Sequence, residues 1–148
     1  YPTVEFQEGL PDVSKFDGSE PVLLIIDDLM NEINSDTEKI FTRMSHHRNI
    51  SVVFIMQNLF PKNKFARTMS LNAHYMVLFK NPRDAGQFAV LAKQMYPNSS
   101  KFAVEAYKDA TDCPYGYLLL DMKPETDERF RLRTNIFPEE NTSVYIKR

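Results

Sequence analysis

Two adjacent carboxylates, Asp27 and Asp28, directly follow the uninterrupted apolar run Val22–Ile26. Such a run is typical of a buried strand, and a strand holds the side chain at its end in a fixed position. Proteins bind Mg²⁺ through one or two carboxylates, and a divalent cation relieves the repulsion between like charges. The pair is therefore a candidate magnesium site. The alternative is that Asp27 caps the turn after the strand.

A second apolar run, Ser51–Met56, also ends in polar side chains, here Gln57 and Asn58. In open α/β sheets, ligands bind at the carboxyl ends of the strands. If the two strands lie side by side, the carboxylates of Asp27 and Asp28 and the amides of Gln57 and Asn58 share one edge. The sequence thus predicts a polar site there.

The segment from Lys39 to Arg83 contains no Asp or Glu, although the chain has 20 acidic residues. The rest of the chain has 10 basic and 20 acidic residues. Such a segment suits a surface that faces phosphate groups, in a nucleotide or in a nucleic acid. The alternative is an ordinary solvated face. The basic residues are Lys39, Arg43, Arg48, Lys62, Lys64, Arg67, Lys80 and Arg83.

Further apolar runs at Tyr75–Phe79 and Tyr117–Met122 predict two more strands. Helical patterns cover Asn34–His47, residues 63–74, 81–96 and 99–111. This alternation predicts an α/β fold with a mostly parallel sheet flanked by helices. Because the first three runs do not alternate with polar residues, we expect those strands to be buried on both faces.

The phosphate-binding pattern G-x-x-x-x-G-K-[ST] is absent, and none of the 4 glycines is followed by Lys. Without that loop no backbone amides converge on a triphosphate, so we expect this chain alone to bind ATP weakly or not at all. The expectation is that the loop lies upstream in a longer protein or has been lost.

The composition fits one globular domain of 148 residues with 43% hydrophobic residues. A single cysteine, Cys113, excludes an intrachain disulfide and favours a reducing compartment. No apolar run reaches the roughly 20 residues of a membrane helix, and the first residues do not form a secretion signal. We therefore expect a protein that is not secreted and has no membrane partner.

Several blocks together resemble the DNA-packaging ATPases of Polinton (Maverick) elements and related double-stranded DNA viruses. The blocks include "LLIIDDLMNE", "FTRMSHHRNISVVFIMQNLF", "SLNAHYMVLFKNPRD" and "PYGYLLLDMKP". These ATPases belong to the FtsK/HerA group of P-loop ATPases and are similar to the poxvirus-type packaging ATPase. The resemblance spans roughly residues 4–137. It implies that residues 1–148 are the C-terminal part of a single RecA/FtsK-like P-loop domain, with the phosphate loop preceding them.

The resemblance implies a role for each residue at the predicted edge. Asp27 would be the Walker B aspartate that holds Mg²⁺ through water, and Asp28 stands where related ATPases often carry a catalytic Glu. Gln57 would be the polar sensor of the γ-phosphate. Arg43 or Arg48 would be the arginine finger that reaches a neighbouring subunit's nucleotide.

The resemblance also implies partners and cofactors. Lys62, Lys64 and Arg67 would contact the DNA backbone in a ring pore, in a sequence-independent and salt-sensitive manner. The intact protein would use ATP and Mg²⁺ to move double-stranded DNA as a hexamer-like ring, with capsid proteins as candidate partners. Its location would be intracellular, in the nucleus or at a viral assembly site. The alternative is a truncated or domesticated relative that binds DNA or acts as a scaffold without hydrolysing ATP.

Overall fold

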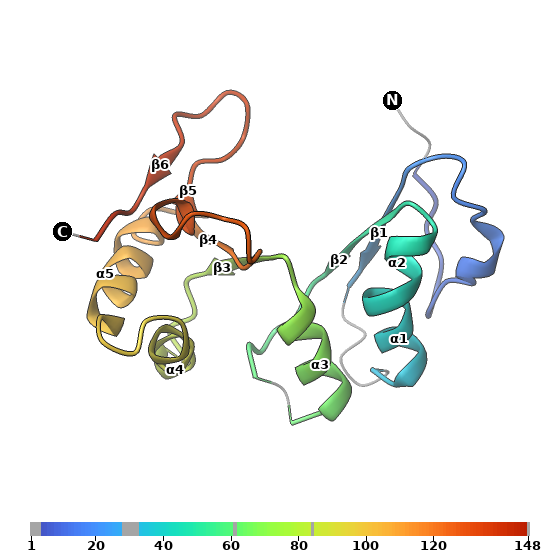
Figure 1. The fold of residues 1–148 in the computed structure, drawn as a ribbon, viewed down its shortest axis with the longest axis horizontal. Coiled ribbons are helices and arrows are strands. Elements are labelled where there is room, and N and C mark those ends of the chain that lie inside the picture. Colours follow the sequence, from blue (N-terminus) through green and yellow to red (C-terminus); the bar gives the residue numbers. More distant parts are fainter. Residues whose placement is uncertain (1–3, 28–32, 61, 84, 148) are drawn as a thin grey trace. The chain divides into compact units, whose positions relative to one another are not determined.

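A computed structural model describes residues 4–27, 33–60, 62–83 and 85–147 of the chain (Figure 1). The chain divides into two compact units, Tyr1–Asn72 and Ala73–Arg148. Each unit has its own sheet and its own helices. The mixed α/β character predicted from the sequence is confirmed in both units.

The first unit is built on a parallel pair of strands, β1 (Val22–Ile26) and β2 (Ile50–Phe54), with Leu24 opposite Val52. The chain crosses from one strand to the other through a helical segment. Its parts are α1 (Ser35–Lys39), the π-helical turn η3 (Ile40–Met44) and α2 (Ser45–His47). The short helix η1 (Val13–Lys15) precedes β1, and α3 (Lys64–Asn72) follows β2.

The crossover helix begins where local chemistry predicts a start. The side chain of Asn34 accepts hydrogen bonds from the backbone amides of Asp36 and Thr37. The hydroxyl of Thr37 accepts the Asn34 amide in return, which completes a capping box. Lys39 near the end of α1 pairs with Asp36 at 2.9 Å. The hydrogen bonds that Asn34 accepts satisfy amides that the first turn of a helix leaves without partners.

The π-helical turn η3 widens this helix at its centre. The amide of Ser45 donates to the carbonyl of Ile40, five residues earlier. Two hydroxyls donate to carbonyls one turn back, from Thr42 to Glu38 at 2.8 Å and from Ser45 to Phe41 at 3.0 Å. Single π turns inside α-helices are rare and are often found at functional sites. Arg43 lies within this turn and is exposed.

Two apolar clusters hold the first unit together. In the first, Val13 of η1, Ile40 of the crossover helix and Ile50 of β2 are buried against one another, with Phe16, Val22, Leu24 and Val52 packed around them. In the second, Ala66 and Met69 of α3 contact Ile33, and Phe41, Phe54 and Phe65 pack beside them. Both clusters leave the opposite face of the sheet uncovered.

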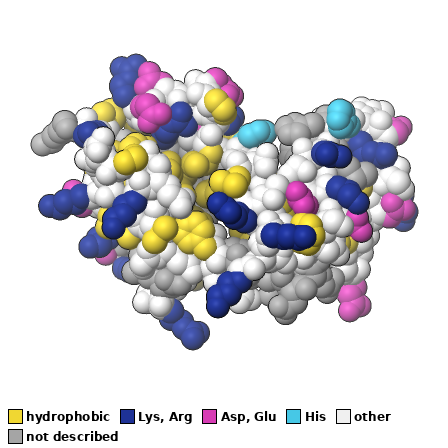
Figure 2. Space-filling model, turned by 60° about the horizontal axis from the view of Figure 1, so that its bottom comes forward, with side chains coloured by type: hydrophobic (Ala, Val, Ile, Leu, Met, Phe, Trp, Pro, Cys, Tyr) yellow, Lys and Arg dark blue, Asp and Glu magenta, His cyan; other side chains and the backbone are white. Residues whose placement is uncertain are grey.

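That uncovered face is apolar. It presents Leu23 and Ile25 of β1, Val53 of β2, and Ile55, which directly follows β2. These four side chains are between 45% and 63% exposed. The expectation that both faces of these strands are buried is therefore wrong within the described residues. The same holds for β3 (Tyr75–Phe79), where Tyr75, Val77 and Phe79 are exposed. Figure 2 shows hydrophobic side chains lying open on the surface.

The second unit has a four-stranded sheet in the order β3-β4-β5-β6, with antiparallel pairing throughout. After β3, the strands are β4 (Tyr117–Asp121), β5 (Leu132–Thr134) and β6 (Ser143–Val144). Two helices, α4 (Ala85–Met95) and α5 (Ser100–Ala110), connect β3 to β4, and the short helix η4 (Glu128–Phe130) precedes β5.

The predicted mostly parallel sheet is therefore wrong for this unit. One crossover helix returns the chain so that the next strand runs parallel, as it does between β1 and β2. A pair of helices, α4 and α5, reverses the chain once more, so β4 enters the sheet antiparallel to β3. The helical pattern expected over residues 81–96 appears as helix α4 over Ala85–Met95.

Strand β4 is the centre of the second unit, and all five of its residues are buried. Leu118 and Leu120 are 0% exposed. Buried residues of α4, α5 and β5 form the rest of this core, namely Phe88, Leu91, Ala92, Ala103, Ala106, Ala110 and Leu132. The last residue of β4, Asp121, is buried and pairs with Arg133 at 2.6 Å. Its other oxygen accepts from the Thr126 hydroxyl at 2.9 Å.

Candidate functional site

The carboxyl edge of the parallel pair carries the polar residues predicted there. Asp27 directly follows β1 and is exposed. The amide of Ile55 donates to the carbonyl of Ile26 at 2.9 Å, so the pairing continues to the very end of β1. Gln57 follows two residues later and is also exposed. The structure confirms that the two strands are neighbours. Asp28 lies outside the described residues.

The amide of Asn58 at this edge has a local role. Its side-chain oxygen accepts the backbone amide of Phe60 at 2.9 Å and so shapes the turn after Gln57. Asp27, Gln57 and Asn58 are all exposed at this edge. A carboxylate and an amide can hold a hydrated cation and orient a water or a phosphate oxygen.

The described residues fit Mg²⁺ only as part of a larger site. Within residues 4–27, 33–60, 62–83 and 85–147, no three His, Cys, Asp or Glu side chains gather as a metal site. Mg²⁺ in nucleotide sites is held by one or two carboxylates together with phosphate oxygens and water. Asp27 can supply one such carboxylate.

The two candidate finger arginines differ in what they contact. Nη1 of Arg48 donates to the carbonyls of Val13, Ser14 and Phe16 at 3.0, 3.0 and 2.8 Å. Arg48 thus fastens the segment around η1 to the end of the crossover helix. Arg43, in the π-helical turn, is exposed. Arg43 is therefore better placed than Arg48 to reach a separate molecule.

Three basic residues cluster at the start of α3. Lys64 and Arg67 lie three positions apart on this helix, Lys62 lies in the loop before it, and all three are exposed. Asn63 fixes the helix start, because its oxygen accepts the Phe65 amide at 2.9 Å and its nitrogen donates to the Ile33 carbonyl at 2.9 Å.

The acid-free segment is divided between the two units. Lys80 follows β3 in the second unit and pairs with Asp112 at 3.7 Å. Arg83 belongs to the same turn, and its amide donates to the side chain of Asn81. The basic residues of the first unit and the pair Lys80 and Arg83 therefore belong to separately folded parts. The sequence pattern could not reveal this division, because charge carries no information about which strand pairs with which.

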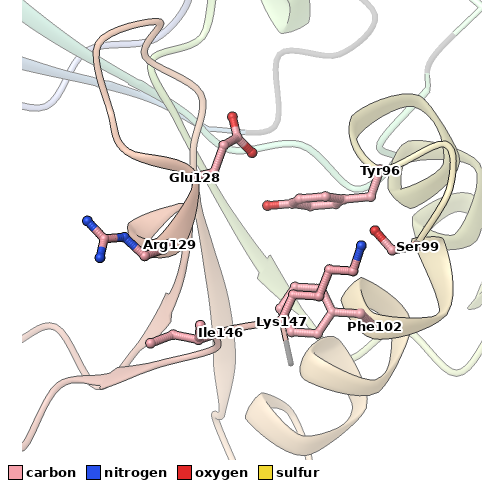
Figure 3. Close-up of a pocket in the computed structure, with 7 residues that line it drawn as sticks. All are labelled: Tyr96, Ser99, Phe102, Glu128, Arg129, Ile146 and Lys147. Carbon is pink, nitrogen blue, oxygen red and sulfur yellow. The ribbon is translucent and has the colours of Figure 1, made fainter.

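A cavity of about 270 Å³ in the second unit was not predicted from the sequence (Figure 3). It lies between the end of α4, the start of α5, η4 and the tail after β6, and Tyr96 and Phe102 meet in it edge to face. Its lining residues are Tyr96, Ser99, Phe102, Glu128, Arg129, Ile146 and Lys147. They come from four segments, so no local spacing in the sequence could have indicated the cavity.

The titratable groups of this cavity differ in their partners, and the buried hydroxyl of Tyr96 has no hydrogen-bond partner among the described residues. Burial raises the pKa of the Tyr96 phenol, and the nearby charge of Glu128 raises it further. Glu128 itself pairs with Arg131 at 2.6 Å. Arg129 donates to Asp127, and these hydrogen bonds hold the pKa of the Asp127 carboxyl at about 2. The cavity thus combines aromatic and apolar walls with two charged residues held in ion pairs, Glu128 and Arg129.

Comparison with known proteins found no matching protein family, no matching curated protein and no matching solved structure. Among the described residues, no helix is long and apolar enough to cross a membrane. The functional assignment therefore depends on the residues themselves and on the resemblance of the sequence blocks.

Proposed function

We propose that this chain is part of an ATP-driven translocase that moves double-stranded DNA, of the FtsK/HerA-type packaging class. The observation that carries the proposal is the parallel pair β1 and β2, whose carboxyl ends bring Asp27 and Gln57 to one edge. In P-loop ATPases this edge holds the magnesium ligand and the residue that senses the γ-phosphate.

In this proposal each exposed residue at the edge has one task. Asp27 accepts a hydrogen bond from a water of the Mg²⁺–ATP complex, and Gln57 orients the attacking water or a γ-phosphate oxygen. Asp28 would help to position that water. ATP and Mg²⁺ supply the reactive phosphoanhydride and neutralise its charge. The residues described here position water and phosphate relative to the rigid sheet.

Arg43 would act on the nucleotide of a neighbouring subunit in a ring. An arginine supplied in trans stabilises the charge that develops on the transferred phosphoryl group. Its exposed place in the π-helical turn supports this role, and the three carbonyl contacts of Arg48 favour Arg43 over Arg48. Lys62, Lys64 and Arg67 would contact DNA phosphates, since they are exposed and adjacent.

The uncovered apolar face of the first unit also supports the proposal. Parallel strands occur almost only where both faces of the sheet are covered. Leu23, Ile25, Val53 and Ile55 leave one face open in this chain. In the intact ATPase, the part that carries the phosphate-binding loop would cover it.

The competing proposal is a relative that binds DNA or acts as a scaffold without hydrolysing ATP. The observation favouring it is the absence of G-x-x-x-x-G-K-[ST] from the chain. In that case the contacts to DNA phosphates would still come from Lys62, Lys64 and Arg67. Asp27 would have no catalytic role and would only follow the end of a strand.

The test is DNA-stimulated ATP hydrolysis by the intact protein that carries this chain. Asp27→Ala should lower kcat by at least about 100-fold, a loss comparable to removing one charge-stabilising group. Asp36→Ala is the matched control, because Asp36 is an exposed carboxylate in the same unit. Undiminished hydrolysis by Asp27→Ala would refute the magnesium assignment.

Mixing experiments test the trans arginine. Arg43→Ala subunits should poison a ring of wild-type subunits, whereas Asp27→Ala and Arg43→Ala subunits mixed together should restore some hydrolysis. If DNA binding persists in every variant and no ATP hydrolysis is detected, the scaffold proposal holds instead.

A further inference from the structure

A second cavity, of about 340 Å³, opens in the second unit where the turn after β3 meets α4 and α5. The described part of this turn, residues 80–83, has no role in the function proposed above. The walls are mainly apolar, and the charged groups lie at the rim. The lining residues are Lys80, Asn81, Pro82, Phe88, Val104, Tyr107, Lys108, Thr111 and Asp112.

The floor of this cavity is aromatic and firmly held. The rings of Phe88 and Tyr107 stack with their centroids 4.5 Å apart and an interplanar angle of 28°. The Tyr107 hydroxyl donates to the carbonyl of Phe79 at 2.8 Å and accepts the amide of Asn81 at 3.2 Å. These two hydrogen bonds fasten the turn to α5, so the cavity is formed before any ligand arrives.

The rim carries an excess of positive charge. Nζ of Lys80 lies 3.7 Å from Asp112, and the two side chains are 59% and 87% exposed. Exposed pairs of this kind contribute little, so the Lys80 ammonium remains able to bind another anion. Lys108 is exposed and forms no salt bridge with any residue that the structure describes. The lining therefore includes two lysines and one carboxylate beside an aromatic floor.

We propose that this cavity binds a ligand with an aromatic ring and an anionic group a few bonds away, such as an arylalkyl carboxylate. The ring would pack on Phe88, Tyr107 and Val104, which are the apolar and aromatic surfaces typical of small-ligand sites. The anionic group would bind the ammonium groups of Lys80 and Lys108. This proposal is independent of ATP hydrolysis, because no residue of the cavity belongs to the β1–β2 edge.

The test is a titration of the whole chain with 3-phenylpropionate, followed by amide chemical shifts. Saturable shifts are expected at Asn81, Tyr107 and Thr111. Two control ligands test the contribution of each part of the ligand to binding. 3-Phenylpropanol has the ring without the charge, and propionate has the charge without the ring. Each should bind at least about tenfold more weakly. Equal binding of 3-phenylpropionate and 3-phenylpropanol, or no saturable shift, overturns the proposal.

One variant and its matched control test the role of Lys108 at the rim. Lys108→Met keeps most of the apolar stem and should weaken 3-phenylpropionate by about tenfold while leaving 3-phenylpropanol unchanged. Lys101→Met on the same helix is the matched control, because Lys101 is 90% exposed and does not line the cavity. It should bind like the wild type. Unchanged affinity in Lys108→Met refutes the assignment of the anionic group.

N-acetyl-Phe-Asp-amide distinguishes the source of the ligand. A peptide that binds more tightly than 3-phenylpropionate indicates that a partner protein supplies the ring and its carboxylate. Tighter binding of 3-phenylpropionate indicates a free small molecule. Failure of the blocked peptide and of 3-phenylpropionate alike to bind the wild-type chain overturns both.

Discussion

The two units contain similar apolar strands, but these strands differ in how far their side chains are buried. Strand β1, "VLLII", leaves Leu23 and Ile25 more than half exposed, whereas β4, "YLLLD", is buried along its whole length. The difference lies in the neighbours. Strand β4 pairs on both sides, with β3 and β5, while β1 pairs only with β2 among the described strands. Burial is thus a property of the assembled sheet and not of the strand's own sequence.

The comparison implies that the second unit has a complete core and that the first does not. Leu118 and Leu120 of β4 have no exposed surface, and helices and strands of the same unit surround them. The first unit has two small clusters and a bare apolar face. Its stability in a larger protein should therefore exceed its stability in this chain.

The largest expected effect comes from the centre of the second unit. Leu120→Ala should lower the free energy of unfolding of that unit by about 2–5 kcal/mol, through lost burial and a residual cavity. Leu23→Ala in β1, where the side chain is 63% exposed, should cost about 0.5 kcal/mol or less. Amide hydrogen exchange measures each unit separately. Equal costs at the two positions would contradict the comparison.

A somewhat smaller effect is expected at the buried end of β4. Asp121→Ala should cost about 3 kcal/mol, because it leaves Arg133 partly buried without its carboxylate partner. The double variant Asp121→Ala with Arg133→Met should recover part of this loss, since no uncompensated charge remains. Urea unfolding of the single and double variants measures both values. A double variant less stable than the single variant would argue against charge burial as the cause.

The response to alkaline pH should also separate the units. Burial and the hydrogen bond to Asp109 raise the pKa of the Tyr145 phenol. The neutral phenol is thus favoured by folding, so this contribution is complete below about pH 10 and is lost as pH rises through the raised pKa.

Tyr145→Phe should flatten the alkaline loss of stability in the second unit, and Tyr115→Phe is its control because Tyr115 is 93% exposed. The first unit contains no tyrosine among its described residues, so its alkaline stability should not change in either variant. Thermal unfolding between pH 8 and about 11 checks this, and an unchanged slope in Tyr145→Phe would contradict it.

The smallest effect on stability is expected at the bare face of the first unit. Ile25→Thr should change the free energy of unfolding by about 0.5 kcal/mol or less, yet it should reduce binding of a hydrophobic dye. Ile26→Thr is the matched control, since Ile26 is the next residue and is 4% exposed. It should destabilise the unit clearly. If Ile25→Thr destabilises as much as Ile26→Thr, the face is covered in solution.

The sequence predicted the features that depend on local chemistry. Asn34 begins the crossover helix as its side chain predicts, and the parallel pairing of β1 and β2 brings Asp27 to the expected edge. What the sequence did not reveal depends on contacts between distant residues. The hydrogen bonds of Arg48 reach residues more than 30 positions away, and the antiparallel entry of β4 follows from the direction of a helix pair.

For the candidate site, too, the sequence predicted the local features and not those that depend on contacts between distant residues. A strand followed by Asp can be recognised in a sequence, so the place of Asp27 and Gln57 at one sheet edge could be predicted. The cavities could not be found, because Tyr107 reaches the turn after β3 from a helix 26 residues later. The functional roles of Asp27, Gln57 and Arg43 stay predictions until hydrolysis is measured.

The π-helical turn η3 has a consequence for comparing this chain with relatives. A π turn accommodates one more residue than an α turn within the same length of helix. A relative with an ordinary α-helix here should align only with a gap of about one residue between Ile40 and Met44. Each residue rotates an α-helix by about 100°, so in such a relative the position of Arg43 would face a different direction. A one-residue gap at this point would thus separate chains that can present this arginine to a neighbour from those that cannot.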